Sequence, residues 1–131
     1  MIKKHPKGEQ GQALVEMALV LPLFFLLLFG VIEMGRVGHA YISISNAARE
    51  GGRVATIGGT DLEVKSSIVN SASSLDSTNL TITISPIEAS RQSGQEVTVN
   101  VTYPVQLVIP IISNIIANPV VVSSSIIMRQ E

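Results

Sequence analysis

The apolar residues of the chain are concentrated near its N-terminus. Residues 17–32, MALVLPLFFLLLFGVI, contain no polar side chain. Extending this run back to Ala13 gives twenty residues that are interrupted only by Glu16. At about 1.5 Å per residue, twenty helical residues span about 30 Å, the thickness of the hydrocarbon core of a bilayer. Because the run has no polar face and too little chain follows to surround it, the pattern predicts a transmembrane helix over about 13–32.

The charges around this run predict its orientation. Lys3, Lys4 and Lys7 precede it, and few cations follow closely behind it. The positive-inside rule therefore puts the N-terminus in the cytoplasm and residues 33–131 outside. A cleaved secretory signal is the alternative, since it also has a basic start and an apolar middle. Against that alternative, the run is long, and residues 32–36 offer no clean site with small residues for cleavage.

The helix is expected to continue beyond the membrane. Residues 33–57 contain no proline. Apolar and small residues recur there at helical spacing: Val37, Ala40, Tyr41, Ile44, Ala47, Ala48, Gly51 and Ala55. Two Glu–Arg pairs lie three residues apart: Glu33 with Arg36, and Glu50 with Arg53. We predict one helix from Gln12 to near Ile57, ended by the glycines at 58–59.

The rest of the chain predicts a small α+β domain. Thr60 and Glu63 fit a capping box before a second helix at about 61–75. Apolar and polar residues then alternate over 80–85 and 97–103, with residues 89–95 as the hairpin loop between them, and a third strand is expected at 120–128. Residues 104–119 are apolar but broken by prolines, with Pro110 suited to open a short helix at about 110–117.

The expected fold class is therefore α+β. It comprises a long N-terminal helix with a transmembrane first half, a short helix and a small three-stranded antiparallel sheet. The predicted organisation is a basic leader at 1–11, the long helix at 12–57 and an extracytoplasmic domain at 58–131.

Composition narrows the classes of function. Charged residues make up 15% and hydrophobic residues 46% of the chain, and its mean hydropathy is +0.42, as expected for a chain that lies partly in a membrane. Nine basic against ten acidic residues and 4% aromatics argue against binding nucleic acid. Cysteine is absent, His5 and His39 are far apart, and no serine lies in a recognisable nucleophile motif or near a candidate base. We predict no catalytic residues, no metal site and no cofactor, and hence a protein that is not an enzyme.

Glu16 is the first candidate functional residue, because a carboxylate in an apolar helix needs a partner. If the chain were cut after Gly11, Gln12 would carry a free α-amine one helical turn from Glu16, within the same chain or in a neighbour. Alternatively, Glu16 extends its side chain to the lipid headgroups. The residues alone leave these alternatives open.

Three separated blocks resemble a known family: GQALVEMALVLP at 11–22, IEMGR at 32–36 and NAAREGGR at 46–53. A short basic leader that ends in glycine, followed by four residues, a glutamate and an apolar helix, is typical of type IV pilin-like precursors. The closer resemblance is to TadE-like proteins, the pseudopilins of tight-adherence (Tad) pilus systems. It implies cleavage after Gly11 by a prepilin peptidase, with Glu16 needed for processing or assembly. It also implies a bacterial inner-membrane protein whose partners are other pilins or pseudopilins and the pilus assembly machinery, with a role in secretion and adhesion.

Three further features have two interpretations each. Ala47, Gly51 and Ala55 form a stripe of small residues that either contacts a sister subunit or, the favoured alternative, packs against the chain's own sheet. Pro22 should kink or loosen the helix, which either helps helices pack or is merely tolerated. Residues 105–116 either dock on a partner or the bilayer or, as favoured, cover the sheet as a flap.

The expected function is thus assembly or anchoring of a Tad pilus by lateral packing of helices. The alternatives are the main structural subunit of a surface filament, which would self-assemble and enter the extracellular fibre, and a single-pass membrane-anchored binding module.

Overall fold

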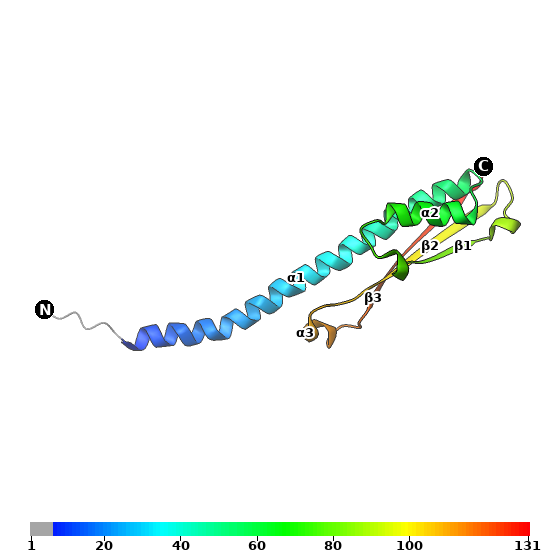
Figure 1. Cartoon of the computed structure of the whole chain (residues 1–131). Helices are drawn as coiled ribbons and strands as arrows, with labels where there is room; N and C mark the ends of the chain where they lie inside the picture. Colours follow the sequence, from blue (N-terminus) through cyan, green and yellow to red (C-terminus); the bar gives the residue numbers. More distant parts are fainter. Residues whose placement is uncertain (1–6) are drawn as a thin grey trace.

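The computed structural model describes residues 7–131, and it shows one long helix joined to a two-layer domain (Figure 1). In chain order the elements are α1 (Lys7–Thr56), α2 (Asp61–Ser71), η1 (Ser77–Asn79), β1 (Thr81–Ser85), η2 (Glu88–Ser90), β2 (Glu96–Val105), α3 (Pro110–Ser113) and β3 (Val120–Arg129). The predicted α+β class, with a long helix, a short helix and three antiparallel strands, is confirmed.

Helix α1 is continuous over 50 residues. It begins at Lys7 rather than at Gln12, so residues 7–11 of the predicted leader are helical; residues 1–6, with His5, lie outside the described residues. At the other end, Gly58 takes a positive φ of 81°, and the N–H of Gly59 donates to the carbonyl of Val54 at 3.0 Å. A glycine in the left-handed conformation is a common helix terminator because other residues are strained there.

The predicted capping box opens α2. The N–H of Glu63 donates to the hydroxyl of Thr60 at 3.2 Å, and the N–H of Thr60 donates to the Glu63 carboxylate at 2.9 Å. The helix ends at Ser71, four residues before the predicted end, because the chain turns at Ala72 toward η1. There the Asp76 carboxylate accepts the N–H of Thr78, and this competing side-chain cap begins a new turn.

The strands form an antiparallel sheet in the order β1-β2-β3. In its register Val99 lies opposite Ile84 on one side and Ile126 on the other. Alternate residues of β2 face the helices and are buried, while Thr98, Asn100 and Thr102 lie on the other face. Helix α3 has only four residues, but it begins at Pro110 as the sequence predicts.

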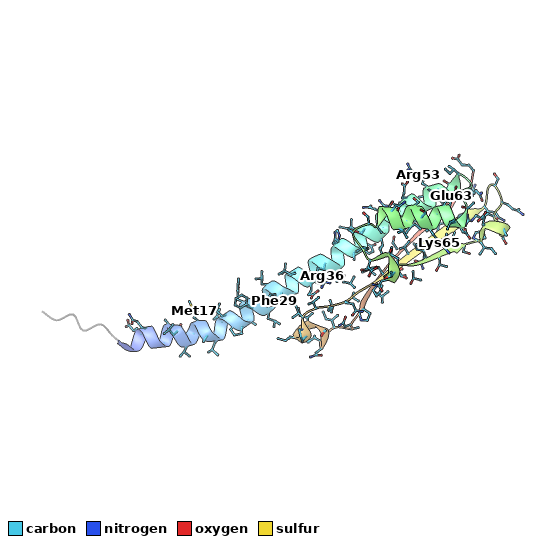
Figure 2. All side chains as sticks on the ribbon, in the orientation of Figure 1. Met17, Phe29, Arg36, Arg53, Glu63 and Lys65 are labelled. Atoms are coloured by element: carbon cyan, nitrogen blue, oxygen red, sulfur yellow. The ribbon has the colours of Figure 1, made fainter. Side chains whose placement is uncertain are left out.

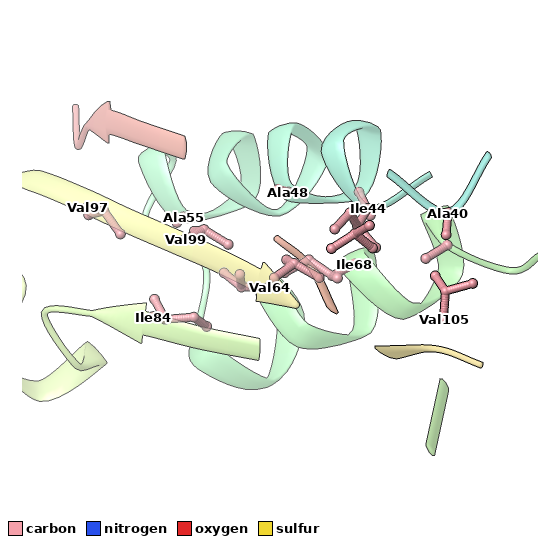
Figure 3. Packing of buried hydrophobic residues seen from close by; sticks show 14 residues of the cluster. Ala40, Ile44, Ala48, Ala55, Val64, Ile68, Ile84, Val97, Val99 and Val105 are labelled. Carbon is pink, nitrogen blue, oxygen red and sulfur yellow. The ribbon is translucent and has the colours of Figure 1, made fainter. Parts of the chain in front are cut away.

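The core lies between the sheet and a layer made by α2 and the second half of α1 (Figure 3). Ile44 of α1, Val64 and Ile68 of α2 and Val99 and Val101 of β2 are all fully buried. Burying a Val or Ile side chain contributes roughly 1.5–3 kcal/mol relative to leaving it exposed. The globular part of the molecule therefore includes the second half of α1, which supplies one of its walls.

Gly51 allows α1 and α2 to approach closely. A Cβ at this position would lie 2.5 Å from Cγ1 of Ile68, a fully buried side chain. We expect Gly51→Ala to lower the free energy of unfolding by about 1–3 kcal/mol, because the two helices must move apart. Thermal unfolding in detergent, followed by circular dichroism, measures this loss.

Gly38→Ala is the matched control, because a Cβ there meets nothing within 4 Å. This second helical glycine should gain up to about 1 kcal/mol from the better helix propensity of alanine. Equal effects of the two substitutions would contradict the close approach at Gly51.

Candidate functional site

Most of the first half of α1 lies apart from the rest of the fold, and only its last turns, at residues 26–31, face the connection between β2 and β3. Side chains such as those of Met17 and Phe29 extend from it with no other element around them (Figure 2). Its most apolar stretch has a mean hydropathy of 2.6, and no part of that stretch is buried. By length and composition, α1 could cross a membrane. A water-exposed helix with this composition would be an aggregation hazard, so its exposed face needs an apolar environment.

Gly11, Gln12 and Glu16 lie within two turns of one another at the N-terminal end of this stretch. The side-chain amide of Gln12 donates to the Glu16 carboxylate at 3.0 Å. Both side chains are exposed, and a Cβ at Gly11 would meet nothing within 4 Å. The geometry therefore places the first residue after Gly11 within reach of Glu16, one helical turn away.

The other predicted helix-packing residues occupy two different environments. Pro22 lies inside α1, in the exposed half of the helix, which bends along its length in Figure 1. Ala47, Gly51 and Ala55 instead lie in the globular half and are buried within the chain, with Gly51 against α2. In this fold the small-residue stripe is thus covered by the chain's own elements.

Glu33 lies where the exposed half of α1 meets the globular part, and it is only 3% exposed. One carboxylate oxygen forms a salt bridge with the guanidinium of Arg36 at 2.7 Å, as the sequence spacing predicts. The other accepts the backbone N–H groups of Val108 at 2.8 Å and Ile109 at 3.3 Å. This second contact joins residues 75 positions apart, which no local pattern could reveal. A glutamate at the edge of an apolar run was the only available signal.

The connection between β2 and β3 lies beside α1 rather than over the sheet. Its short helix α3 is found at the end of the sheet nearer to the N-terminal half of α1 (Figure 1). Leu107 is buried, but Val108 and Ile115 are more than two-thirds exposed. The flap over the sheet that was favoured for residues 105–116 is therefore wrong, because Glu33 holds the connection against the helix instead.

Polar clusters in the globular part anchor loops. The Arg91 guanidinium binds the Asp61 carboxylate and the carbonyls of Pro86 and Gly59, at 3.1 and 3.0 Å. Burial lowers the pKa of Arg91, although a guanidinium remains charged. Hydrogen bonds from the side chain and then the backbone of Thr78 lower the pKa of Asp76. These contacts fix the start of α2 and the ends of the loops.

His39 has one polar neighbour that the sequence did not predict. Its Nε2 lies 3.2 Å from the hydroxyl of Ser74, on the loop after α2. The pair is exposed, and the hydroxyl of Ser43 lies 3.3 Å from that of Ser74. No carboxylate in the described part of the chain hydrogen-bonds to this imidazole, whereas a serine nucleophile needs a base that is itself oriented. Within residues 7–131, no group of three or more His, Cys, Asp or Glu is placed to hold a metal.

Removing the Glu33 carboxylate should release the connection from α1. We expect Glu33→Ala to destabilise the protein by about 1–3 kcal/mol, because two partly buried N–H groups lose their charged acceptor. Hydrogen exchange at the amides of Val108 and Ile109 should become faster in the same variant.

Glu50→Ala is the matched control, since Glu50 also pairs with an arginine three residues on, at 2.7 Å, but in an exposed position. It should cost less than about 0.5 kcal/mol, the usual range for exposed helical pairs. Unchanged exchange at Val108 in Glu33→Ala would contradict the role given to Glu33.

Comparison with known proteins shows a similarity of this helix to one family. Residues 11–53 match the family model described as TadE-like protein. The match covers about a third of the chain and lies entirely within α1. No curated protein and no solved structure gives a match to the chain. Over residues 11–53 the chain is thus similar to TadE-like proteins, which confirms the resemblance that its motifs indicate.

Proposed function

We propose that the protein is a pseudopilin that is inserted in the bacterial inner membrane by the first half of α1. Its N-terminus faces the cytoplasm, and its α+β domain lies outside. A prepilin peptidase cleaves it after Gly11, and α1 then packs laterally against other pilins or pseudopilins to assemble or anchor a Tad pilus. Such a protein functions by the association of helices and catalyses no reaction.

The observation that carries this proposal is the position of the family match on the fold. The match begins at Gly11 and ends at Arg53, so it covers both the exposed apolar half of α1 and the half that forms the core. An apolar helix without protein around it is what lateral packing in a membrane requires. The family and this helix together fit a membrane protein of a Tad pilus system.

The continuity of α1 supports retention of the helix over removal as a secretory signal. Cleavage behind residue 32 would leave Glu33 next to a new terminus, although Glu33 holds the backbone at Val108 and Ile109. It would also separate the apolar half from a helix that runs unbroken to Thr56.

Processing is tested by mass spectrometry of the intact protein and its N-terminal peptide, isolated from native membranes. We expect the chain to begin at Gln12. Gly11→Leu should accumulate as the precursor, because the peptidase must admit the residue before the cleaved bond. The fold should tolerate the change, since space around this position is open.

Gly8→Leu is the matched control for processing. Gly8 is also an exposed helical glycine with nothing within 4 Å of its Cβ, but it lies three residues before the proposed cut. It should be cleaved normally. A mature wild-type chain that still carries residues 1–11 where the peptidase is active would refute processing and favour the anchored binding module.

Glu16 is proposed to pair with the α-amine of Gln12, in its own chain or in a neighbour. Removing one partner of a buried ion pair costs roughly 3–5 kcal/mol, so where the amine belongs to a neighbouring chain, Glu16→Ala should weaken helix association on the order of a hundredfold or more. The measurement is the amount of pilus recovered in sheared surface fractions. The same fractions, probed for this protein, distinguish a minor component from the main filament subunit.

Glu9→Ala serves as the control, because Glu9 lies in the proposed leader and is absent from a processed chain. It should leave pilus recovery unchanged. Unchanged pilus recovery in both variants would contradict the ion pair. It would favour the alternative, in which the Glu16 side chain extends to the lipid headgroups.

A further inference from the structure

An apolar groove separates α1 from the connection between β2 and β3. It measures about 790 Å³. One wall includes Leu27, Gly30 and Val31 of α1, and the other includes Ile112, Ile115 and Ile116. The core of the domain meets the groove at Val37 and Leu107, and the outer wall of the groove is the connection held by Glu33.

We propose that acyl chains of the outer leaflet fill this groove and that residues 107–117 are a second membrane contact of the protein. The inference rests on the proposed insertion of α1. In addition to the anchor provided by α1, the domain would then contact the bilayer directly through its β2–β3 connection.

The position of the groove along α1 gives the first support. Leu27, Gly30 and Val31 belong to the last turns of the apolar run, and Glu33 directly follows it. From Glu33 back to Leu27, six residues of helix measure about 9 Å. Apolar segments that lie in a membrane interface are buried about 5–10 Å deep. When α1 spans the bilayer, the groove therefore opens at the depth of the outer leaflet.

The side chains of the connection give the second support. The chain has no Asp, Glu, Lys or Arg between Glu96 and Arg129. Val108 is 71% exposed, Ile111 58% and Ile115 77%. A single exposed isoleucine is ordinary on a protein surface, but a cluster of them beside an apolar groove marks a surface that contacts an apolar partner.

The backbone of the connection gives an independent argument. In hydrocarbon, each backbone polar group needs a partner within the protein, because no water is available. The N–H groups of Val108 and Ile109 donate to Glu33, and that of Leu107 donates to the side chain of Asn118 at 3.0 Å. The N–H groups of residues 112–116 donate to carbonyls within the same turn. Pro110 and Pro119 have no N–H to satisfy.

A helix from a second chain is the competing occupant. Helix pairs in membranes approach through small residues spaced four apart. On the α1 wall Gly30 is followed four residues later by Met34 and preceded by Leu26, so this spacing offers no small pair. Flexible side chains around an open groove suit flexible acyl chains better.

The test uses the absence of cysteine in the chain. Three single-cysteine variants of the full-length protein, Ile115→Cys, Phe24→Cys and Ile127→Cys, are labelled with an environment-sensitive fluorophore. They are reconstituted into phosphatidylcholine–phosphatidylglycerol vesicles with or without lipids that carry a nitroxide quencher on the acyl chain. Phe24 reports on the proposed span. Ile127 is the matched control, an isoleucine on β3 that is 62% exposed but lies outside the connection.

We expect shallow quenchers to reduce the fluorescence at Ile115 by about half or more, and deep quenchers to reduce it less, as for a segment 5–10 Å into the interface. Phe24 should be quenched most by the deep nitroxide, and Ile127 by neither. Quenching at Phe24 with none at Ile115 would overturn this inference and leave the proposed span intact. No quenching at Phe24 would overturn both.

Varying the protein-to-lipid ratio distinguishes acyl chains from a second protein chain as the occupant of the groove. If acyl chains fill the groove, quenching at Ile115 stays constant as the protein-to-lipid ratio is raised. Shielding of Ile115 at high ratios, together with disulfide-linked dimers of the Ile115→Cys variant, would mean that a second chain occupies the groove and would overturn the proposal.

Discussion

The packing of the second half of α1 against α2 and the sheet is the interaction on which the rest of the structure depends. Small residues on the buried face let α2 approach closely, and Ile44 fills the space between the layers. Because α1 is unbroken, the same packing fixes the direction in which its apolar half leaves the domain. Glu33 provides the second contact of α1, since it binds the β2–β3 connection at the point where the apolar half of the helix ends. Two contacts of one helix therefore determine both the fold and the position of the domain relative to the exposed apolar half of α1.

Local patterns in the sequence were enough to predict most of the elements. Capping by Thr60 and Glu63, the terminating glycines, the start of α3 at Pro110 and the alternation in β2 each depend on neighbours within a few residues. The boundaries that were wrong depend on competition between such signals. Helix α2, for example, ends at Ser71 with Ala72 as its C-cap, and Asp76 then caps a separate turn at Ser77–Asn79.

Contacts between distant segments were beyond sequence reasoning. The motif places Gln12 beside Glu16, and the structure has them hydrogen-bonded, because both lie on one helical turn. The attachment of the connection to Glu33 and the approach of Ser74 to His39 both need the tertiary fold. For residues 105–116, composition could not distinguish a flap over the sheet from a segment beside α1, since either location buries apolar side chains. The hydrogen bonds of Val108 and Ile109 to Glu33 decided between them.

The unbroken course of α1 also has a mechanical consequence. Its last residue is tied to the end of the sheet, because the N–H of Glu131 donates to the carbonyl of Thr56 at 2.9 Å. A force on the N-terminal half, directed along the axis of α1, therefore acts parallel to the interface between α1 and the rest of the domain. Such a shear force loads all the contacts of this interface together and does not break them one after another. Buried contacts from Ala40 to Ala55 share the load. The domain and the second half of α1 should move as one body, so that a tilt is absorbed only in the exposed half, where Pro22 lies and the helix bends.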